Sequence, residues 1–418
     1  MKWTILFLLI SVSALAQDCD ELLKFKAEEY YINVKNKPDS LNQLSCKLIQ
    51  RQLEPGSVFI DISEAEMNHQ SEFLVLIILP KGEPEVIEIP MKQDTSKNIK
   101  QSAADKRGGK TESSAEEEVY SLADYKNFWS FIEPAINGSR KIYYSSSRLL
   151  NLLNLKFIKD ESGDFLFENY EMVRLHSGAS FLGEHKRIVL PRKMDVLLVG
   201  GLRYDCKPGT GVNWDYLPGT RTEISDIRSL LSKAHYVVSI DSCMATEAKL
   251  SASINSARYD VVHIATHGFY FPETEKGFGV TPDTYPMERG GIVLSGGNNK
   301  TATIDVFNQD GLFTAMEMQQ LNLSNIRFMV LSTCHSGEGD ASENTAPLGM
   351  TLAMMRNGIQ AMMVSNRAVP DKETSLFMKT FYGKLVSNGD LDKCYMLTIR
   401  ELHEKFPDTD WSFFDLVH

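Results

Sequence analysis

The sequence predicts an α/β fold with a mainly parallel central sheet. Three short apolar runs, at residues 194–200, 261–265 and 328–331, are not cleanly alternating, which indicates strands buried on both faces. Helix-length segments separate such strands, and this spacing calls for right-handed crossovers and a sheet covered on both faces. In open sheets of this kind, chemistry takes place at the carboxyl ends of the strands.

The first 16 residues predict a secretory signal peptide. Lys2 provides the leading positive charge, an apolar run follows, and Ala14 and Ala16 form an A-x-A cleavage pattern. The apolar run is too short to span a bilayer, and no later stretch predicts a membrane span. We therefore expect an exported protein, periplasmic or secreted, whose mature chain begins at Gln17.

The net charge argues against a nucleic-acid-binding protein, and the cysteine spacing argues against a zinc protein. A formal net charge of -11 over 418 residues argues against a nucleic-acid partner, which would require a basic face, and fits plain solubility. The 6 cysteines include no C-x-x-C pair and no other zinc spacing, so we expect neither a metal site nor a cofactor. Disulfides are expected in an exported protein, and Cys19 with Cys46 is the first pairing to test. If Cys334 is a free nucleophile, at least one further cysteine stays unpaired.

The N-terminal part is expected to hold a short helical segment followed by strands. Residues 17–54 contain helical spacing that is interrupted near Pro38. Strand patterns follow at residues 58–62, 73–79 and 85–89. Residues 93–118, rich in Lys, Ser, Gly and Glu, predict a flexible loop. This loop is either a passive insertion or, at Lys106 and Arg107, a processing site.

The remaining elements fall into a β-rich stretch up to residue 190 and an alternating strand and helix region from residue 191. In the first stretch we expect a helix at residues 120–135 and strands at 141–144, 165–167 and 170–175. In the second we expect helices at residues 222–231, 246–253, 348–355, 372–386 and 391–406. Further strands are expected there at residues 236–240, 290–294 and 359–364.

Two of the buried strands end in reactive side chains. His267 follows the run at 261–265, and Cys334 follows the run at 328–331. A cysteine nucleophile needs a nearby base to raise its thiolate fraction, and a histidine at the next strand end can supply it. The backbone N–H groups of Gly268 and Cys334 are candidates for an oxyanion hole. On this pattern alone, the alternative is a purely structural role for both side chains.

His263 lies four residues before His267 on the same strand face. Four residues of a strand span about 13 Å, so the two histidines cannot bind one metal ion. We expect His263 to be a packed, hydrogen-bonded core residue.

The residues around the two strand ends resemble the catalytic motifs of a known family. The Thr-His-Gly sequence at 266–268 and the Ser-Thr-Cys-His-Ser-Gly sequence at 332–337 are similar to those of caspase-like (clan CD) cysteine peptidases, and in particular of their CHAT branch. Further similar segments occur in the family's order at residues 216–224, 244–248, 357–361, 370–371, 381–382 and 411–414.

The resemblance implies a caspase-like αβα sandwich with a β-rich part before it. Residues 55–190 would form the N-terminal, pseudo-caspase-like part of a CHAT domain, which opens with an antiparallel meander, and residues 191–418 the catalytic part. The implied reaction is hydrolysis of a protein or peptide substrate through a His267 and Cys334 dyad and a thioester, with no third carboxylate. The competing interpretation is a catalytically silent or partner-activated interaction protein on the same fold.

The sequence does not decide which side chain is preferred before the cut. By resemblance, Ser332 lines the pocket for the side chain that precedes the cut, and Asp205 and Asp371 are the acidic candidates that would favour Lys or Arg there. Asp371 is equally a natural helix cap. Arg367 would instead accept an acidic side chain. The acidic stretch at 337–344 is either a surface loop or an activation or lid segment.

Overall fold

The computed structural model describes residues 18–30, 44–67, 70–91, 124–146, 150, 154–182, 187–206, 214–270, 286–288, 290–298, 309–333, 351, 354–355, 357–365 and 371–418. The predicted signal peptide, the loop at 93–118 and the stretch at 337–344 lie outside these residues. No helix within the described ranges is both long and apolar enough to cross a membrane. The chain divides into unit 1 (Met1–Leu150 and Ile158–Glu184) and unit 2 (Asn151–Phe157 and His185–His418).

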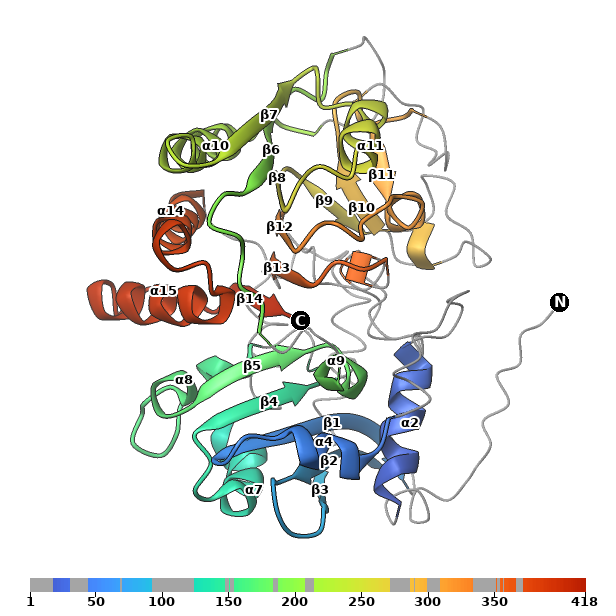
Figure 1. Cartoon of the computed structure of the whole chain (residues 1–418), viewed down its shortest axis with the longest axis vertical. Helices are drawn as coiled ribbons and strands as arrows, with labels where there is room; N and C mark the ends of the chain where they lie inside the picture. The colour runs from blue at the N-terminus through green and yellow to red at the C-terminus, as the bar shows by residue number, and fades with distance from the viewer. Residues whose placement is uncertain are drawn as a thin grey trace, which may run out of the picture. The chain divides into compact units, whose positions relative to one another are not determined.

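Unit 1 is built on a mixed sheet with the strand order β3-β2-β1-β4-β5. Its strands are β1 (Ser57–Met67), β2 (Gln70–Ile78), β3 (Glu85–Pro90), β4 (Lys141–Ser145) and β5 (Glu171–Leu175). The first three form the expected antiparallel meander, whereas β4 and β5 run parallel to β1. One face is covered by α2 (Cys19–Tyr30), α4 (Cys46–Gln52) and α9 (Gly178–Leu182) (Figure 1). Leu23, Ile49 and Phe181 of these helices bury Phe59 of β1 in one apolar cluster.

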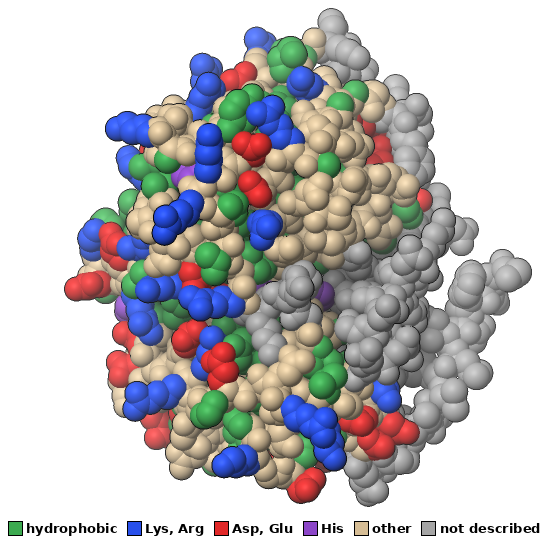
Figure 2. All heavy atoms as spheres, in the orientation of Figure 1, with side chains coloured by type: hydrophobic (Ala, Val, Ile, Leu, Met, Phe, Trp, Pro, Cys, Tyr) green, Lys and Arg blue, Asp and Glu red, His purple; other side chains and the backbone are tan. Residues whose placement is uncertain are grey.

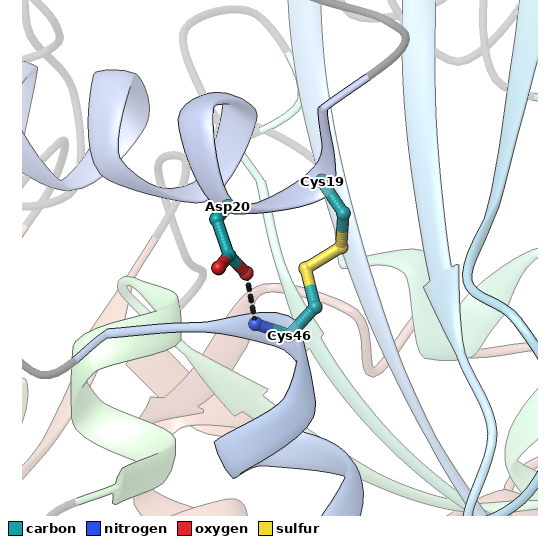
Figure 3. A group of neighbouring side chains, drawn as sticks. All are labelled: Cys19, Asp20 and Cys46. Carbon is teal, nitrogen blue, oxygen red and sulfur yellow. Dashed lines mark hydrogen bonds between the residues drawn. A yellow bond between two sulfur atoms is a disulfide. The ribbon is translucent and has the colours of Figure 1, made fainter.

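A disulfide between Cys19 and Cys46 confirms the pairing proposed from the sequence. It joins the first residues of α2 and α4, and the carboxylate of Asp20 accepts a hydrogen bond from the Cys46 N–H at 2.7 Å (Figure 3). These three residues also have ligand atoms close enough to share a metal ion. Because the two sulfurs are bonded to each other, neither is available as a thiolate, and the pair is a covalent link between helices.

Unit 2 carries a mainly parallel sheet with the strand order β14-β13-β12-β8-β6-β7. Its strands are β6 (Asp195–Leu202), β7 (Tyr236–Ser242), β8 (Val261–Ala265), β12 (Phe328–Ser332), β13 (Ala361–Ser365) and β14 (Phe414–Val417). The strands β6, β7, β8, β12 and β13 run parallel to their neighbours, and β14 pairs antiparallel with β13. Every residue of β8, β12 and β13 is buried, as continuous apolar strands covered on both faces should be.

Helices cover both faces of the unit 2 sheet (Figure 1). One face carries α10 (Pro218–Leu231), α14 (Asp371–Asn388) and α15 (Leu391–Lys405); the other carries α11 (Glu247–Asn255) and α12 (Ala315–Met318). A small antiparallel sheet of β9 (Gly268–Tyr270), β10 (Gly290–Val293) and β11 (Leu312–Thr314) lies on the α11 side. This α/β architecture matches the predicted fold class.

Local predictions differ from the structure in several places. The expected strand at residues 165–167 is wrong: α8 (Leu166–Asn169) begins there, because the Glu168 carboxylate accepts the Phe165 N–H at 2.8 Å and caps a helical turn. The expected helix at 120–135 is a π-turn (Tyr125–Trp129), α7 (Ser130–Ile132) and a 3₁₀ turn (Glu133–Ile136), and its first residues lie outside the described ranges. Strand β14 was not expected.

Candidate active site

The two strands that lead to the predicted dyad are neighbours in the sheet. In the parallel pair of β8 and β12, Ala265 lies opposite Ser332, and the Thr266 N–H donates to the Ser332 carbonyl at 3.3 Å. His267 is two residues beyond Ala265. Cys334, two residues beyond Ser332 in sequence, lies outside the described residues. The chain segments with both motifs therefore leave the sheet from adjacent points on one edge.

The imidazole of His267 lies next to two aromatic rings. The ring of Tyr204 lies 5.2 Å from it and the ring of Trp214 5.3 Å, centroid to centroid. The Nε2 atom lies 2.7 Å from the carbonyl oxygen of Asp215. A carbonyl oxygen can only accept, so Nε2 carries the ring proton and donates it. That tautomer leaves Nδ1 as the basic nitrogen.

Thr266 fixes the backbone just before His267. Its hydroxyl donates to the Val293 carbonyl of β10 at 2.6 Å, so the Tyr204 hydroxyl, 2.9 Å away, must donate to Thr266. Burial raises the pKa of Tyr204, which keeps the proton that this bond needs. The Val293 N–H in turn donates to the His267 carbonyl at 2.9 Å. His267 is therefore anchored to the small sheet and to the segment after β6.

Gly268, the predicted oxyanion donor, is the first residue of β9 and pairs with Ile292 of β10. The small sheet is packed so closely that a Cβ on Gly291 would lie 2.3 Å from the Phe313 carbonyl oxygen. This tight packing fixes the chain path at Gly268, immediately after the histidine.

A narrow pocket opens between the motif segments and α10. Its cavity volume is about 50 Å³, and its lining consists of Leu217, Gly219, Thr220, Glu223, Thr266, Ser332, Thr333, Ser365, Thr374 and Phe414. The hydroxyl of Ser332 donates to Oε2 of Glu223 at 3.2 Å. The structure thus brings the predicted pocket residue Ser332 against a buried carboxylate.

His263 lies beneath this pocket and is fully buried, as expected. Its Nδ1 is 3.2 Å from the Tyr382 hydroxyl. Its Nε2 is 3.0 Å from Oε1 of Glu223, a distance that suits an ion pair, but neither atom makes a hydrogen bond. The direction of the ring N–H, rather than the distance, prevents that bond.

Sequence reasoning missed Glu223, although a signal was present. The buried residues of α10 are Thr220, Glu223, Ile224, Ile227 and Leu231, which form the inward stripe of a helix. A carboxylate inside such a stripe is buried with a polar partner, and burial of an acidic group is uncommon enough to indicate a site.

A second, larger cleft has a volume of about 720 Å³, and Tyr204 and Trp214, whose rings lie next to His267, are part of its lining. It is lined by Gly201, Arg203, Tyr204, Asp205, Trp214, Asp215, Tyr216, Arg221, Asp241, Ser242 and Asn298. Asp205 is here, exposed and paired with Arg203 at 3.2 Å, which lowers the pKa of its carboxyl. The structure therefore places Asp205 in a different cavity from Ser332.

The side chains of two other predicted site residues, Asp371 and Arg367, lie outside what the structure describes. Asp371 is the first residue of α14. Arg367 lies outside the described residues.

One disulfide of unit 2 lies next to the residues that line the larger cleft. A disulfide joins Cys206, after β6, to Cys243, after β7. Among the described cysteines, Cys394 is the free one; it is buried, and burial raises its pKa to about 12. The expectation of a further unpaired cysteine besides Cys334 is thus met.

A mainly parallel sheet with a strand-end histidine beside the strand that leads to a cysteine motif defines a caspase-like α/β protein. The chain belongs to the CHAT domain family, whose model matches residues 125–403. No curated protein matches the sequence.

Solved structures are similar to the chain at low sequence identity. The separase of Saccharomyces cerevisiae, in complex with securin, has a TM-score of 0.51 and 11% identity over 95% of this chain and 33% of its own. The Arg-specific cysteine proteinase gingipain R (RgpB) has a TM-score of 0.42 and 11% identity over 72% of this chain and 66% of its own. RgpB of Porphyromonas gingivalis, in a complex of its pro- and mature domains, has a TM-score of 0.42 and 12% identity over 78% of this chain and 77% of its own. The chain thus spans a third of the separase chain.

Proposed function

We propose that this protein is an exported cysteine endopeptidase of the CHAT type, with His267 as the base and Cys334 as the nucleophile. The observation that carries the proposal is the fixed orientation of His267. Its Nε2–H is bound to the Asp215 carbonyl, and the strand that leads to Cys334 is the neighbour of its own strand. Among the described residues Nδ1 has no partner, as a base that awaits a substrate or a thiol requires.

The reaction follows from this tautomer. Nδ1 takes the proton of the Cys334 thiol, and the thiolate attacks the scissile carbonyl carbon. The N–H groups of Gly268 and Cys334 hold the resulting oxyanion. The imidazolium then gives its Nδ1 proton to the leaving amine as the C–N bond breaks, and water hydrolyses the thioester. The Asp215 carbonyl stabilises the imidazolium through Nε2–H, so a third carboxylate is not needed in this role.

Export is part of the proposal. The predicted signal peptide and the two disulfides support it, because disulfides persist in oxidising compartments. The net charge of -11, and the mixture of basic and acidic side chains on the face in Figure 2, argue against nucleic acid as the substrate.

The test compares residues 17–418 with the Cys334→Ala variant, using thiol-directed peptide probes and intact mass. One probe adduct that disappears in Cys334→Ala, and slows in His267→Ala, is the expected result. Cys394→Ala is the matched control, because a buried thiol with a pKa of about 12 should not react. Folded protein that no probe labels would favour the second candidate, a silent or partner-activated protein.

A further inference from the structure

The disulfide between Cys206 and Cys243 holds two strands together just beyond the point where their pairing ends. The last pair of β6 and β7 is Leu202 with Ser242, after a shift in register. Beyond it, the Arg203 N–H donates to the Ser242 carbonyl at 3.4 Å, which is long for a hydrogen bond. The disulfide is therefore the covalent link that fixes the segment after β6 to the segment after β7.

Tyr204, two residues before Cys206, connects the first of these segments to the candidate base. Its ring lies 5.2 Å from the ring of His267, and its hydroxyl donates to Thr266 at 2.9 Å. The side chain is buried, so it cannot move without changing the packing around it. A displacement of the segment at Cys206 therefore disturbs the surroundings of the imidazole.

A second connection starts at Ser242, the residue before the second cysteine. Its carbonyl accepts the hydroxyl of Ser295 at 2.5 Å. Asn298, three residues further along, binds the N–H and the carbonyl of Trp214 through its side-chain amide. Because the Trp214 ring lies 5.3 Å from that of His267, both sides of the disulfide are connected to the imidazole.

Ser242 has a backbone conformation that residues other than glycine rarely adopt. Its φ is 51°, in the left-handed region, which is costly for a residue with a Cβ. Such a conformation persists only where the surroundings impose it, and here they include the disulfide at Cys243 and the hydrogen bond from Ser295. Opening the disulfide removes one of these restraints, and relaxation of Ser242 then favours the open form.

The two disulfides differ in how easily a thiol reaches them. Cys243 is exposed and Cys206 is partly exposed, whereas Cys46 is 4% exposed and its disulfide with Cys19 joins two helices (Figure 3). Thiol–disulfide exchange requires direct attack on a sulfur atom, so exposed disulfides are the ones that thiols reduce first. Mild reduction should therefore open the link between Cys206 and Cys243 and leave the other intact.

We propose that this disulfide is a redox switch for the candidate active site. In the oxidised form it holds Tyr204 and Trp214 beside His267 and the site is fast; in the reduced form these restraints loosen and the site is slow. The inference rests on the proposed peptidase function and adds its regulation. Combined with the proposed export, it confines fast cleavage to an oxidising compartment, where disulfides persist.

The chemistry of the switch is thiol–disulfide exchange with a small thiol such as glutathione. One glutathione thiolate attacks Sγ of Cys243 and forms a mixed disulfide, while Cys206 leaves as a thiolate and takes up a proton. A second glutathione thiolate attacks the glutathione sulfur of the mixed disulfide, which releases Cys243 as a thiol and forms oxidised glutathione. Two electrons and two protons enter the protein, and oxidised glutathione reverses the reaction.

The test prepares the mature protein in the oxidised form, after reduction with glutathione, and after reoxidation with oxidised glutathione; each sample is then freed of small thiols. Alkylation and peptide mapping identify the free cysteines and check that Cys334 carries no glutathione. A thiol-directed peptide probe is then added, and its adduct at Cys334 is followed by the same mapping, because the opened pair also reacts. We expect glutathione to open the pair of Cys206 and Cys243 but not that of Cys19 and Cys46.

Labelling of Cys334 is expected to be roughly 10-fold slower in the reduced form, because small misplacement of a catalytic group is costly, and to recover on reoxidation. Cys206→Ser with Cys243→Ser should label at the slow rate with or without glutathione. Cys19→Ser with Cys46→Ser is the matched control and should keep the full response to glutathione.

The outcomes separate this inference from the peptidase proposal. Equal or faster labelling of the reduced form, or resistance of the link between Cys206 and Cys243 to glutathione, overturns the switch and leaves the peptidase proposal intact. Absence of labelling at Cys334 in both forms defeats the peptidase proposal and the switch with it. Should glutathione open both disulfides, the response of Cys19→Ser with Cys46→Ser decides, and its loss overturns the switch. Should the double variant at Cys206 and Cys243 not fold, the reduced parent protein decides, because it has the same open pair.

Discussion

The Nε2 atom of His267 lies 2.7 Å from the carbonyl oxygen of Asp215, a residue 52 positions earlier in the chain. The partner is a backbone atom, so the identity of the Asp215 side chain is not what orients the ring. The orientation of the ring therefore depends on the position of the backbone at Trp214 and Asp215, and the side chain of Asn298 holds that segment in place.

Asn298 holds both aromatic segments that flank His267. Its Oδ1 accepts the Trp214 N–H at 2.6 Å, its Nδ2 donates to the Trp214 carbonyl at 3.1 Å, and its own N–H donates to the Tyr204 carbonyl at 3.1 Å. We predict that Asn298→Ala lowers kcat by about 10-fold or more with little change in KM, because small misplacement of a catalytic group is costly. Steady-state kinetics with a cleavable peptide would measure this.

The control for this prediction is Asp215→Asn, which keeps the carbonyl and should retain kcat within about twofold. Equal losses in both variants would show that the Asp215 side chain, not the backbone carbonyl, supports His267.

The disulfide between Cys206 and Cys243 closes a segment with a sequence separation of 37, next to the loop with Tyr204. Closure of such a segment in the unfolded chain corresponds to about 3–4 kcal/mol. We predict that the Cys206→Ser, Cys243→Ser double variant lowers the free energy of unfolding of unit 2 by up to this amount, and slows labelling of Cys334. Urea unfolding without reductant measures the first effect and probe kinetics the second.

The corresponding variant of the other disulfide, Cys19→Ser with Cys46→Ser, is the comparison, because that link lies in unit 1. It should leave the labelling rate of Cys334 unchanged. If both double variants slow labelling alike, the effect on the site is not specific to the Tyr204 loop.

Apolar runs predicted the central strands well, because burial on both faces leaves a continuous signal in the sequence. Strand β14 gave no such signal: Asp415 lies within it, and its buried charge is matched by Lys156 at 2.6 Å, 259 residues away. Pairing over that distance cannot be derived from local pattern.

Only part of the candidate site could be predicted from the sequence. His267 was predicted from its place at a strand end, whereas the contact between Ser332 and Glu223 depends on how α10 packs on the sheet. At residues 165–167 the local pattern predicted a strand that does not form. Two phenylalanines have the alternating spacing of a strand there, but the chain forms a capped helical turn.

Glu247 should make the stability of unit 2 depend on pH. It is buried at the start of α11, where burial is the main cause that raises its pKa to about 8, with further raising by the carboxylates of Glu317 and Asp310; the N–H of Gly311 opposes the shift. The folded protein therefore holds this proton more tightly than the unfolded chain, in which the ordinary pKa is 4.5. The stabilisation is complete below about pH 4.5 and is lost as the pH rises through about 8.

We predict that Glu247→Gln removes this loss, because the amide is uncharged at every pH and can still accept the Gly311 N–H. The free energy of unfolding of the variant should exceed that of the parent at pH 9 and approach it at pH 5, as measured by urea unfolding across that range. Glu401→Gln is the contrasting variant: hydrogen bonds from Lys384 and Lys405 lower the pKa of Glu401, so its loss should not stabilise the protein at pH 9. Parallel curves for the parent and Glu247→Gln would show that the Glu247 carboxyl titrates alike in the folded and unfolded chains.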